Sequence, residues 1–313
     1  RFLTDADRAE LFGHDAPWSD EEIAAKVAKC HSQTSIRNRV IFSSGVSQSE
    51  APGVIKEINA GTTTELAVIA AKNCLDSAKV LPTELDAIIC GTNTGPGYPS
   101  IADRVKEGLG NSRDSHAECH DLTEACTAGA IAVKQGWLMI NSGLYNKVLV
   151  VLSERASLLA PFDRWTHANL FGDAASAVLL VRGLEEAFVF FDTHSMPWGD
   201  YLGLIGKAED GSGFQHDGNN VHKFVGRIIA PAIIRTFELA GIDPVDIDHF
   251  VPHQPSGKTL DLLFKKLAGT FKFWDGNGER PDDQCLFHNQ VADTGNLSSV
   301  STIWLISKAI QDG

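Results

Sequence analysis

An internal repeat constrains the fold of this chain more than any other feature of its sequence. Residues 62–80 have the apolar spacing of an amphipathic helix after a run of threonines suited to an N-cap, and a Pro-containing turn and a short strand at 85–90 follow. Residues 221–242 repeat that helix, and the match continues in register through the turn and the strand. The paired positions are Ala78 with Ala240, Pro82 with Pro244 and Asp86 with Asp248. Strands that alternate with helices predict βαβ units and a mostly parallel sheet covered by helices.

A second correspondence divides the chain into two halves. A helical segment follows Cys126 and ends at Gly143, and another follows Asn296 and ends at Gly313. We therefore expect Cys126 and Asn296 to occupy equivalent positions in an N-terminal half, 1–183, and a C-terminal half, 184–313. Because a strand at 147–152 follows the first of these helices, we also expect the natural protein to continue beyond Gly313 by a strand and a Gly-rich turn, and to begin before Arg1 with another strand.

Composition excludes several classes of function. The 313 residues are 43% apolar, no apolar run has the roughly 18 residues of a membrane helix, and no signal peptide opens the chain, so a cytoplasmic protein without a membrane partner is expected. A net charge of −13 argues against a nucleic-acid partner. The six cysteines form no C-x-x-C pair and the histidines have no metal-ligand spacing, so we expect no metal and five buried, structural cysteines.

Five segments, in this order and spacing, carry a specific resemblance to a known family. They read DLTEACTAG (121–129), SGLYNKVLVV (142–151), DRWTHANLFGDAASAV (163–178), IDHFVPHQ (247–254) and GNLSSVS (295–301). The chain resembles the β-ketoacyl-acyl-carrier-protein synthase III family and its relatives in polyketide pathways. The resemblance implies an α/β fold of the thiolase-like, duplicated, five-layered α/β/α/β/α type that works as a homodimer. It also implies a catalytic set of Cys126, His253 and Asn296.

The chemistry of these three residues fits such a site. Cys126 stands between a predicted strand at 120–125 and a helix that begins at Thr127, and a helix N-terminus favours the thiolate that attacks an acyl thioester. His253 ends the apolar strand at 250–252, and Asn296 precedes a helix. Two N–H donors can stabilise the enolate that forms when a malonyl-type unit loses carbon dioxide.

The family binds a phosphopantetheine arm in a tunnel with basic residues at its mouth. The resemblance implies substrate or pantetheine contacts at Arg37, Arg164, Ser256 and Gly129, and docking of a carrier protein at Lys223, Lys258, Lys265 and Lys266. The last three lysines fall on one helical face, which suits an acidic carrier helix or is simply a solvated surface.

Two positions depart from the family pattern. Gly129 stands where an aromatic residue is usual, which predicts either a pocket for an acyl chain bulkier than acetyl or a space that neighbouring side chains fill. Glu124 replaces a small residue and could act as an auxiliary base or as a hydrogen-bonding group across a dimer interface.

The resemblance implies a ketosynthase of polyketide or fatty-acid biosynthesis. Such an enzyme joins an acyl group held on Cys126 to a malonyl or β-ketoacyl unit bound to acyl carrier protein or CoA. No cofactor is expected besides these thioester substrates. Two alternatives remain open: an acyltransferase of the same fold that forms an ester or amide, and a non-catalytic partner subunit of a condensing enzyme.

Overall fold

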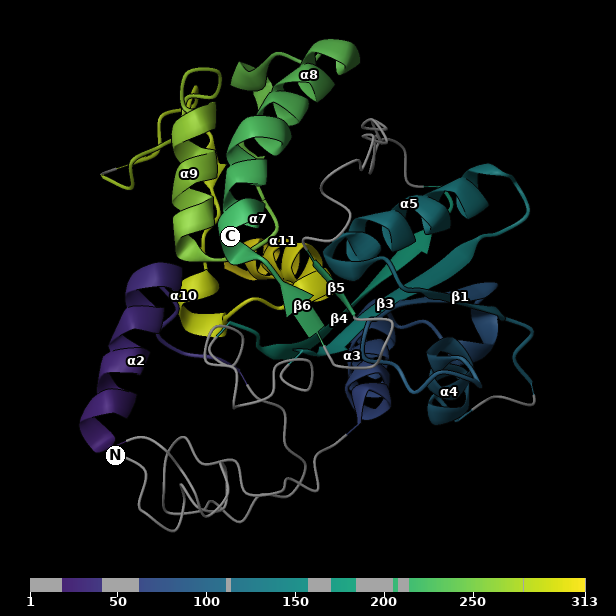
Figure 1. Cartoon of the computed structure of the whole chain (residues 1–313). Coiled ribbons are helices and arrows are strands. Elements are labelled where there is room, and N and C mark those ends of the chain that lie inside the picture. The colour runs from purple at the N-terminus through teal and green to yellow at the C-terminus, as the bar shows by residue number, and fades with distance from the viewer. Residues whose placement is uncertain are drawn as a thin grey trace.

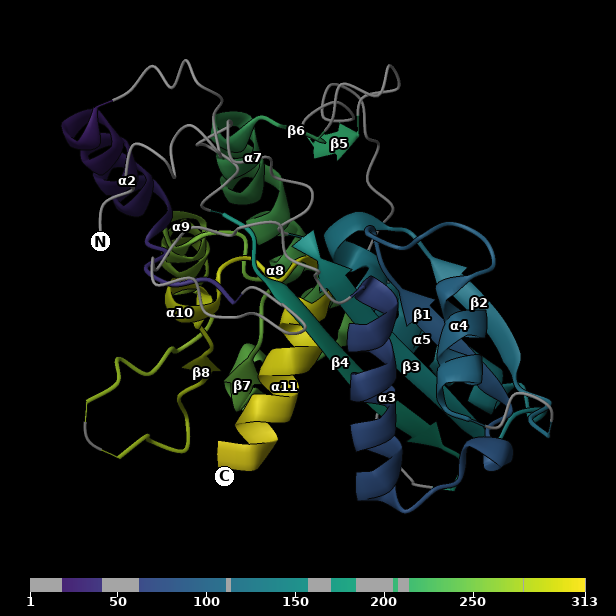
Figure 2. The ribbon, with the colours of Figure 1, turned by 90° about the horizontal axis from the view of Figure 1, so that it is seen from below.

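The computed structural model describes residues 19–40, 62–110, 114–156, 170–183, 205–207, 214–277 and 279–312. Strands between residues 87 and 181 form a four-stranded sheet in the order β2-β1-β3-β4; Figure 1 labels β1, β3 and β4, and Figure 2 labels all four. Strands β2, β1 and β3 are parallel, and β4 runs antiparallel to β3. The expected sheet is therefore mostly parallel, with one antiparallel edge strand. The bounds are β1 Ala87–Gly91, β2 Glu118–Leu122, β3 Lys147–Arg155 and β4 Asp173–Val181.

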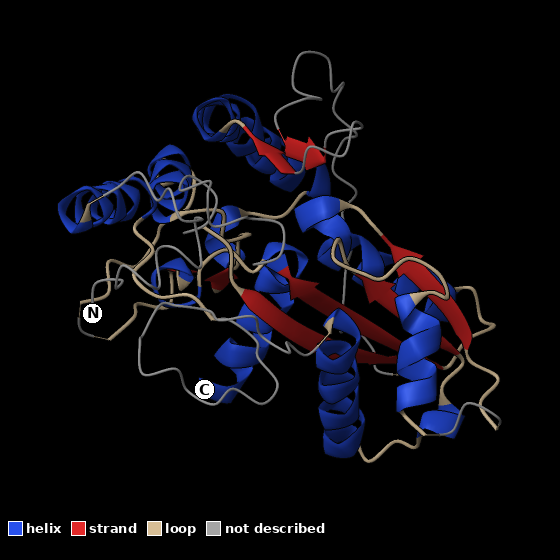
Figure 3. Ribbon diagram, turned by 60° about the horizontal axis from the view of Figure 1, so that its bottom comes forward, coloured by secondary structure: helices blue, strands red, loops and turns tan. Residues whose placement is uncertain are grey.

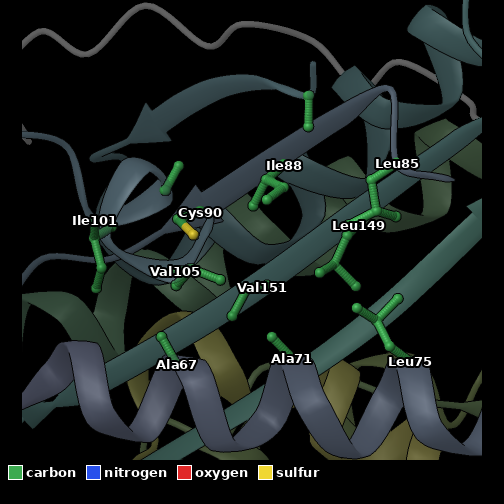
Figure 4. Packing of buried hydrophobic residues seen from close by; sticks show 12 residues of the cluster. Ala67, Ala71, Leu75, Leu85, Ile88, Cys90, Ile101, Val105, Leu149 and Val151 are labelled. Atoms are coloured by element: carbon green, nitrogen blue, oxygen red, sulfur yellow. The ribbon is translucent and has the colours of Figure 1, made fainter. Parts of the chain in front are cut away.

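Helices α3 (Thr63–Ala78) and α4 (Ile101–Gly108) cover one face of this sheet. Thr62 caps α3 with a capping box, because its side chain accepts from Glu65 while the Glu65 carboxylate accepts from the Thr62 amide. Small α3 residues, Ala67 and Ala71, face the strands, and this permits the close approach visible in Figure 4. Strand residues such as Ile88 fill the layer between, which confirms the amphipathic helix predicted at 62–80.

Helices α5 (Ala128–Asn141) and α11 (Ser301–Asp312) contribute to the cluster on the opposite face of the sheet. Ala132 and Val133 of α5 pack against Val148 and Val150 of β3, and the chain just before α11 adds apolar side chains to the same cluster. Helix α5 follows Cys126 and α11 follows Asn296, which confirms the two helices of the second correspondence, while the division into halves at residue 183 stays a prediction. Figure 2 shows α3 and α11 on different sides of the sheet.

The second half repeats the helix, turn and strand of the first. Its helix is interrupted, since a π turn at Val225–Ile229 precedes Pro231, which has no N–H to donate to a carbonyl four residues earlier. The Pro-containing turns both form 3₁₀ helices, Pro82–Glu84 and Pro244–Asp246. The bounds of the regular elements of this half are β5 Ile205–Lys207, β6 Phe214–His216, α7 Gly218–Phe224, α8 Ala230–Ala240, β7 His249–Phe250, α9 Gly257–Leu267, β8 Leu286–Phe287 and α10 Val291–Thr294.

Helices α8 and α9 pack on the short parallel pair β7 and β8 around a cluster of phenylalanines. Phe250 stacks on Phe287 with ring centroids 5.6 Å apart, and Phe271 stacks on Phe273 at 5.6 Å. Strand β7 is shorter than predicted and ends three residues before His253. The remaining helix, α2 (Asp20–Thr34), lies near α9, and Figure 3 shows these helices beside the larger sheet.

None of the helices in the described ranges is long and apolar enough to cross a membrane. The cysteines are all free; Cys30, Cys90 and Cys285 are buried as expected, whereas Cys74 and Cys119 are only partly buried. The prediction of five buried cysteines is therefore wrong for these two residues.

Candidate active site

Cys126 lies in a strained turn that connects β2 to α5. Strand β2 ends at Leu122, and a 3₁₀ turn at Ala125–Thr127 carries Cys126 before α5 begins at Ala128. Ala125 has a φ of 49°, in the left-handed region that costs a residue with a Cβ roughly 1 kcal/mol or more. Asn93 holds this conformation: its Oδ1 accepts from the Ala125 amide at 3.0 Å, and its Nδ2 donates to the Ala125 carbonyl at 3.2 Å.

Asn296 lies in a second turn, between α10 and α11. Gly295 has a φ of 73°, which reverses the chain after α10, and the Asn296 amide donates to the Leu170 carbonyl at 2.8 Å. The buried Asn296 side chain bridges two segments. Its Oδ1 accepts from the Ser298 amide at 2.8 Å, and its Nδ2 donates to the Pro255 carbonyl at 3.4 Å.

His253 follows β7 in a segment fixed by the side chain of Gln254. The Gln254 Nε2 donates to the carbonyls of Pro252 and His288, and its Oε1 accepts from the Gln290 amide. His253 Nδ1 is buried, and no residue in the described ranges hydrogen-bonds to it. Burial lowers the pKa of His253 to about 4, so its imidazole is neutral near pH 7 and offers one N–H donor.

These contacts bring the three predicted segments together. The Cys126 Sγ lies 3.9 Å from the Ser298 Oγ, two residues beyond Asn296, and the Asn296 amide reaches Pro255, two residues beyond His253. The sulfur predicted to be the nucleophile and two candidate N–H donors therefore come from segments that contact one another, an arrangement compatible with thioester chemistry.

The state of the sulfur differs from the prediction. Burial raises the pKa of Cys126 to about 11; the Ser298 hydrogen bond opposes this effect, and the nearby Glu154 carboxylate adds to it. The helix start compensates only in part: the backbone N–H of Cys126 lowers the pKa of the thiol, whereas the N–H groups of Thr127 and Ala128 donate to the carbonyls of Glu124 and Ala125 within the turn. The expectation that this position favours the thiolate is wrong for the protein without substrate.

Glu154 was missed by the sequence analysis. It is fully buried near the carboxyl end of β3, and burial raises the pKa of its carboxyl. Its carboxylate accepts hydrogen bonds from Asn93, Thr94, Ser298 and Ser299. A Ser-Glu pair directly after the apolar run 148–152 was the available signal, since polar residues at the carboxyl ends of parallel strands gather at sites.

Gly129 does not open a pocket. A Cβ at this position would lie well inside van der Waals contact with the Ser299 carbonyl oxygen and 3.1 Å from Leu152 Cδ1. The backbone after Asn296 therefore occupies the space, and the prediction of a void left by a missing aromatic side chain is wrong. The glycine allows α5 to approach that backbone closely.

The other predicted site residues lie around these turns. Ser256 caps α9 by accepting from the Thr259 amide at 3.4 Å, and the exposed Arg37 pairs with Asp293, three residues before Asn296. Glu124 is exposed, and its carbonyl accepts from the Thr127 hydroxyl at 2.6 Å. Arg164 lies outside the described residues.

The predicted carrier-docking lysines are exposed. Lys223 is on α7, while Lys258, Lys265 and Lys266 are on the surface of α9, whose opposite face buries Leu260, Leu263 and Leu267. Helices α7 and α9 meet where the His222 Nδ1 lies 3.4 Å from the Thr259 hydroxyl. The described part of the chain has no group of three or more His, Cys, Asp or Glu residues arranged to hold a metal ion.

Comparison with known proteins identifies the family. The family model described as 3-oxoacyl-[acyl-carrier-protein (ACP)] synthase III matches residues 120–197. The chain is 31% identical over 266 residues to a β-ketoacyl-[acyl-carrier-protein] synthase III of Streptococcus sanguinis, a match that covers 80% of this chain and 76% of that relative.

Solved structures agree on the fold. The 3-oxoacyl-[acyl-carrier-protein] synthase III of Aquifex aeolicus superposes with a TM-score of 0.72 at 26% identity, covering 91% of this chain and 82% of that one. The priming β-ketosynthase of the R1128 polyketide biosynthetic pathway has the same fold, with a TM-score of 0.68 at 23% identity over 94% of this chain and 84% of that one. On these similarities, this chain belongs to the β-ketoacyl-acyl-carrier-protein synthase III family and has the thiolase-like fold.

Proposed function

We propose that this chain is a ketosynthase that holds an acyl group as a thioester on Cys126 and condenses it with a carrier-bound malonyl or β-ketoacyl unit. The observation that carries the proposal is the meeting of three turns. Ser298 links the Cys126 turn to the Asn296 turn, and Asn296 contacts the segment of His253. Membership of the condensing family gives the class of reaction, a transferase that forms a carbon–carbon bond.

In the first half-reaction the Cys126 thiolate attacks the carbonyl carbon of an acyl thioester. The carrier or CoA thiol leaves and takes up a proton, and the acyl group remains on the sulfur. Because the pKa of Cys126 is about 11 in the free protein, a basic group of the site or of the bound substrate has to accept the thiol proton for this step to be rapid near pH 7.

In the second half-reaction a malonyl unit loses carbon dioxide and becomes an enolate. The N–H groups of His253 and Asn296 donate to the enolate oxygen, its carbon attacks the acyl carbonyl, and the Cys126 thiolate leaves. A histidine with a pKa of about 4 is a weak base, which favours a donor role and a malonyl unit that needs no proton abstraction. The reaction needs no cofactor beyond the thioesters themselves.

Intact-protein mass spectrometry with a panel of acyl-carrier and acyl-CoA thioesters tests the proposal. We expect an acyl adduct on the native protein and none on Cys126→Ala. His253→Ala and Asn296→Ala should keep the adduct but lose most β-ketoacyl product when malonyl carrier is added. An ester or amide product would instead indicate the acyltransferase, and the absence of any adduct would indicate a non-catalytic partner.

We also propose that the active protein is a homodimer that pairs through β2. Among the described strands β2 is one of the two edges of its sheet, on the side away from β4, and its exposed residues include Glu118 and Asp121. An uncovered edge strand has free backbone groups that a second copy can satisfy. Sedimentation equilibrium at micromolar concentration should give a dimer mass, and a monomer would contradict the proposal.

A further inference from the structure

A buried carboxylate organises both turns of the site. Glu154 has no exposed surface, and its two oxygens accept from the amide and Nδ2 of Asn93, the hydroxyl of Thr94 and the hydroxyls of Ser298 and Ser299. All of these donors are neutral, and no salt bridge in the described part of the chain includes Glu154. Burying a carboxylate without a cation beside it is unfavourable, and the hydrogen bonds from these donors offset that cost. We therefore expect Glu154 to have a specific role in the site.

One arm of the network reaches the turn that carries the nucleophile. Asn93 Nδ2 lies 2.6 Å from Glu154 Oε1, which orients the amide so that it can also bind both backbone groups of Ala125. Ala125 is the left-handed residue directly before Cys126. The strained turn that presents the sulfur is thus held by Asn93, and Asn93 is held by Glu154.

The other arm reaches the turn that carries Asn296. Ser299 donates to Glu154 at 2.7 Å and Ser298 at 3.4 Å, while the Ser298 amide donates to the Asn296 Oδ1. Ser298 also has a left-handed φ, 51°, so this turn is strained as well. The same carboxylate therefore bridges the two strained turns whose side chains must face one substrate.

We propose that Glu154 is a positioning residue that fixes the Cys126 turn relative to the Asn296 turn, acting through Asn93 on one side and Ser298 and Ser299 on the other. This inference rests on the proposed function only where it concerns the rate of acyl transfer. The effect of Glu154 on the reactivity of the Cys126 sulfur can be measured without any acyl substrate. The role of Glu154 and the ketosynthase activity can therefore be tested separately.

The charge of Glu154 provides a second readout. Besides burial, three groups in the described ranges affect the ionisation of Cys126. Ser298 from the Asn296 turn and the backbone N–H of Cys126 lower the pKa through hydrogen bonds, and Glu154 from β3 raises it through its charge. Removing the negative charge should lower the pKa of Cys126 and make the thiol more acidic. A loss of positioning should at the same time slow acyl transfer, so the two effects have opposite signs.

The test uses the full chain with Glu154→Gln, which keeps the shape and removes the charge, and Glu84→Gln as a matched control. Glu84 is partly exposed and binds Lys147 at the opposite end of β3. The pH profile of iodoacetamide alkylation at Cys126, followed by peptide mass spectrometry, should move down by about one pH unit in Glu154→Gln. The rate of acyl loading should fall about tenfold to a hundredfold, as expected for a displaced nucleophile. Neither quantity should change in Glu84→Gln.

A second variant, Asn93→Ala, is needed in case Glu154→Gln misfolds. Asn93 lies on a loop, and its replacement removes the link to Ala125 but leaves the Glu154 carboxylate in place. Asn93→Ala should therefore slow acyl loading without lowering the pH at which Cys126 is alkylated. An unchanged profile together with unchanged loading in Glu154→Gln would overturn the inference. A slower alkylation of the Cys126 thiolate at high pH in both Glu154→Gln and Asn93→Ala, while the native protein forms no acyl adduct, would support the positioning role of Glu154 and reject the ketosynthase.

Discussion

The sulfur of Cys126 lies 3.9 Å from the hydroxyl of Ser298, although 172 positions separate the two residues in the chain. Ser298 belongs to the turn after Asn296, so this contact joins the proposed nucleophile to the turn of a proposed N–H donor. It also opposes the increase in the pKa of Cys126 that burial causes.

We predict that Ser298→Ala makes Cys126 less reactive. When Cys126 ionises, the Ser298 hydroxyl can turn its proton from Glu154 to the thiolate. Without the hydroxyl the thiolate loses this hydrogen bond, the pKa of Cys126 rises further, and alkylation at pH 8 should slow several-fold because the thiolate fraction falls. Iodoacetamide labelling followed by mass spectrometry measures this. Ser32→Ala is the control, since Ser32 is exposed and donates only to the Lys29 carbonyl. Faster labelling of Ser298→Ala would show that the hydroxyl obstructs the sulfur.

We predict that the rate of alkylation of native Cys126 rises about tenfold for each pH unit up to about pH 11. The reason is that only the thiolate reacts, and burial places the pKa of Cys126 at about 11. Cys126→Ala should lose the labelled peptide altogether. If the alkylation rate instead reached a plateau below pH 9, the helix start would lower the pKa of the thiol, as the sequence had predicted.

The sequence could predict the repeated helix, turn and strand because each copy carries its own local signals. Pro82 and Pro244 each open a 3₁₀ turn, and the threonines before α3 cap it. Cys126, His253 and Asn296 were predicted for a different reason, since each stands in a family motif. The links between their segments, through Ser298 and Pro255, are seen only in the structure.

Glu154 could not be assigned in this way. Its partners Asn93 and Ser299 lie 61 and 145 positions away, so the network exists only after the halves pack together. The surroundings of Gly129 could not be predicted either. The sequence shows that an aromatic side chain is missing at this position, but only the structure shows that the Ser299 carbonyl occupies the space.

We predict that Gly129→Ala destabilises the protein by about 1–3 kcal/mol. The added methyl group would contact the Ser299 carbonyl, whose backbone cannot yield without moving the Asn296 turn. Urea unfolding measures the change. Gly269→Ala is the matched control, because a Cβ there meets nothing within 4 Å, and its effect should stay within about 0.5 kcal/mol. Equal stability of the two variants would show that the helix shifts freely.

We predict that His253 makes the fold less stable in acid. Burial lowers its pKa to about 4 in the folded protein, against roughly 6.5 in the unfolded chain, so the unfolded chain binds more protons between these values. The free energy of unfolding therefore falls as the pH decreases from about 6.5 to about 4, by up to about 3 kcal/mol from this residue.

Replacing the histidine isolates its share of that loss. His253→Asn should lose less stability over the interval than the native protein does. His288→Asn is the comparison, because burial and the neighbouring His249 lower the pKa of His288 as well, but it is more exposed. Parallel curves for native protein and His253→Asn would mean that His253 is solvated when folded.

We predict that the α9 lysines bind an acidic carrier. Lys258 and Lys265 are exposed on one helix of a chain with a net charge of −13, so they form a local basic surface that a carrier helix can approach. Asp261 lies between them on the exposed side of α9 and weakens the positive potential of this surface.

Double replacement, Lys258→Glu with Lys265→Glu, should raise KM for acyl carrier about tenfold or more and leave kcat for a short acyl-CoA unchanged. The difference should shrink at high salt, because the Debye length falls to about 3 Å at 1 M. Lys72→Glu on the exposed side of α3 changes the net charge without touching α9, and a matching rise in KM there would attribute the effect to overall charge.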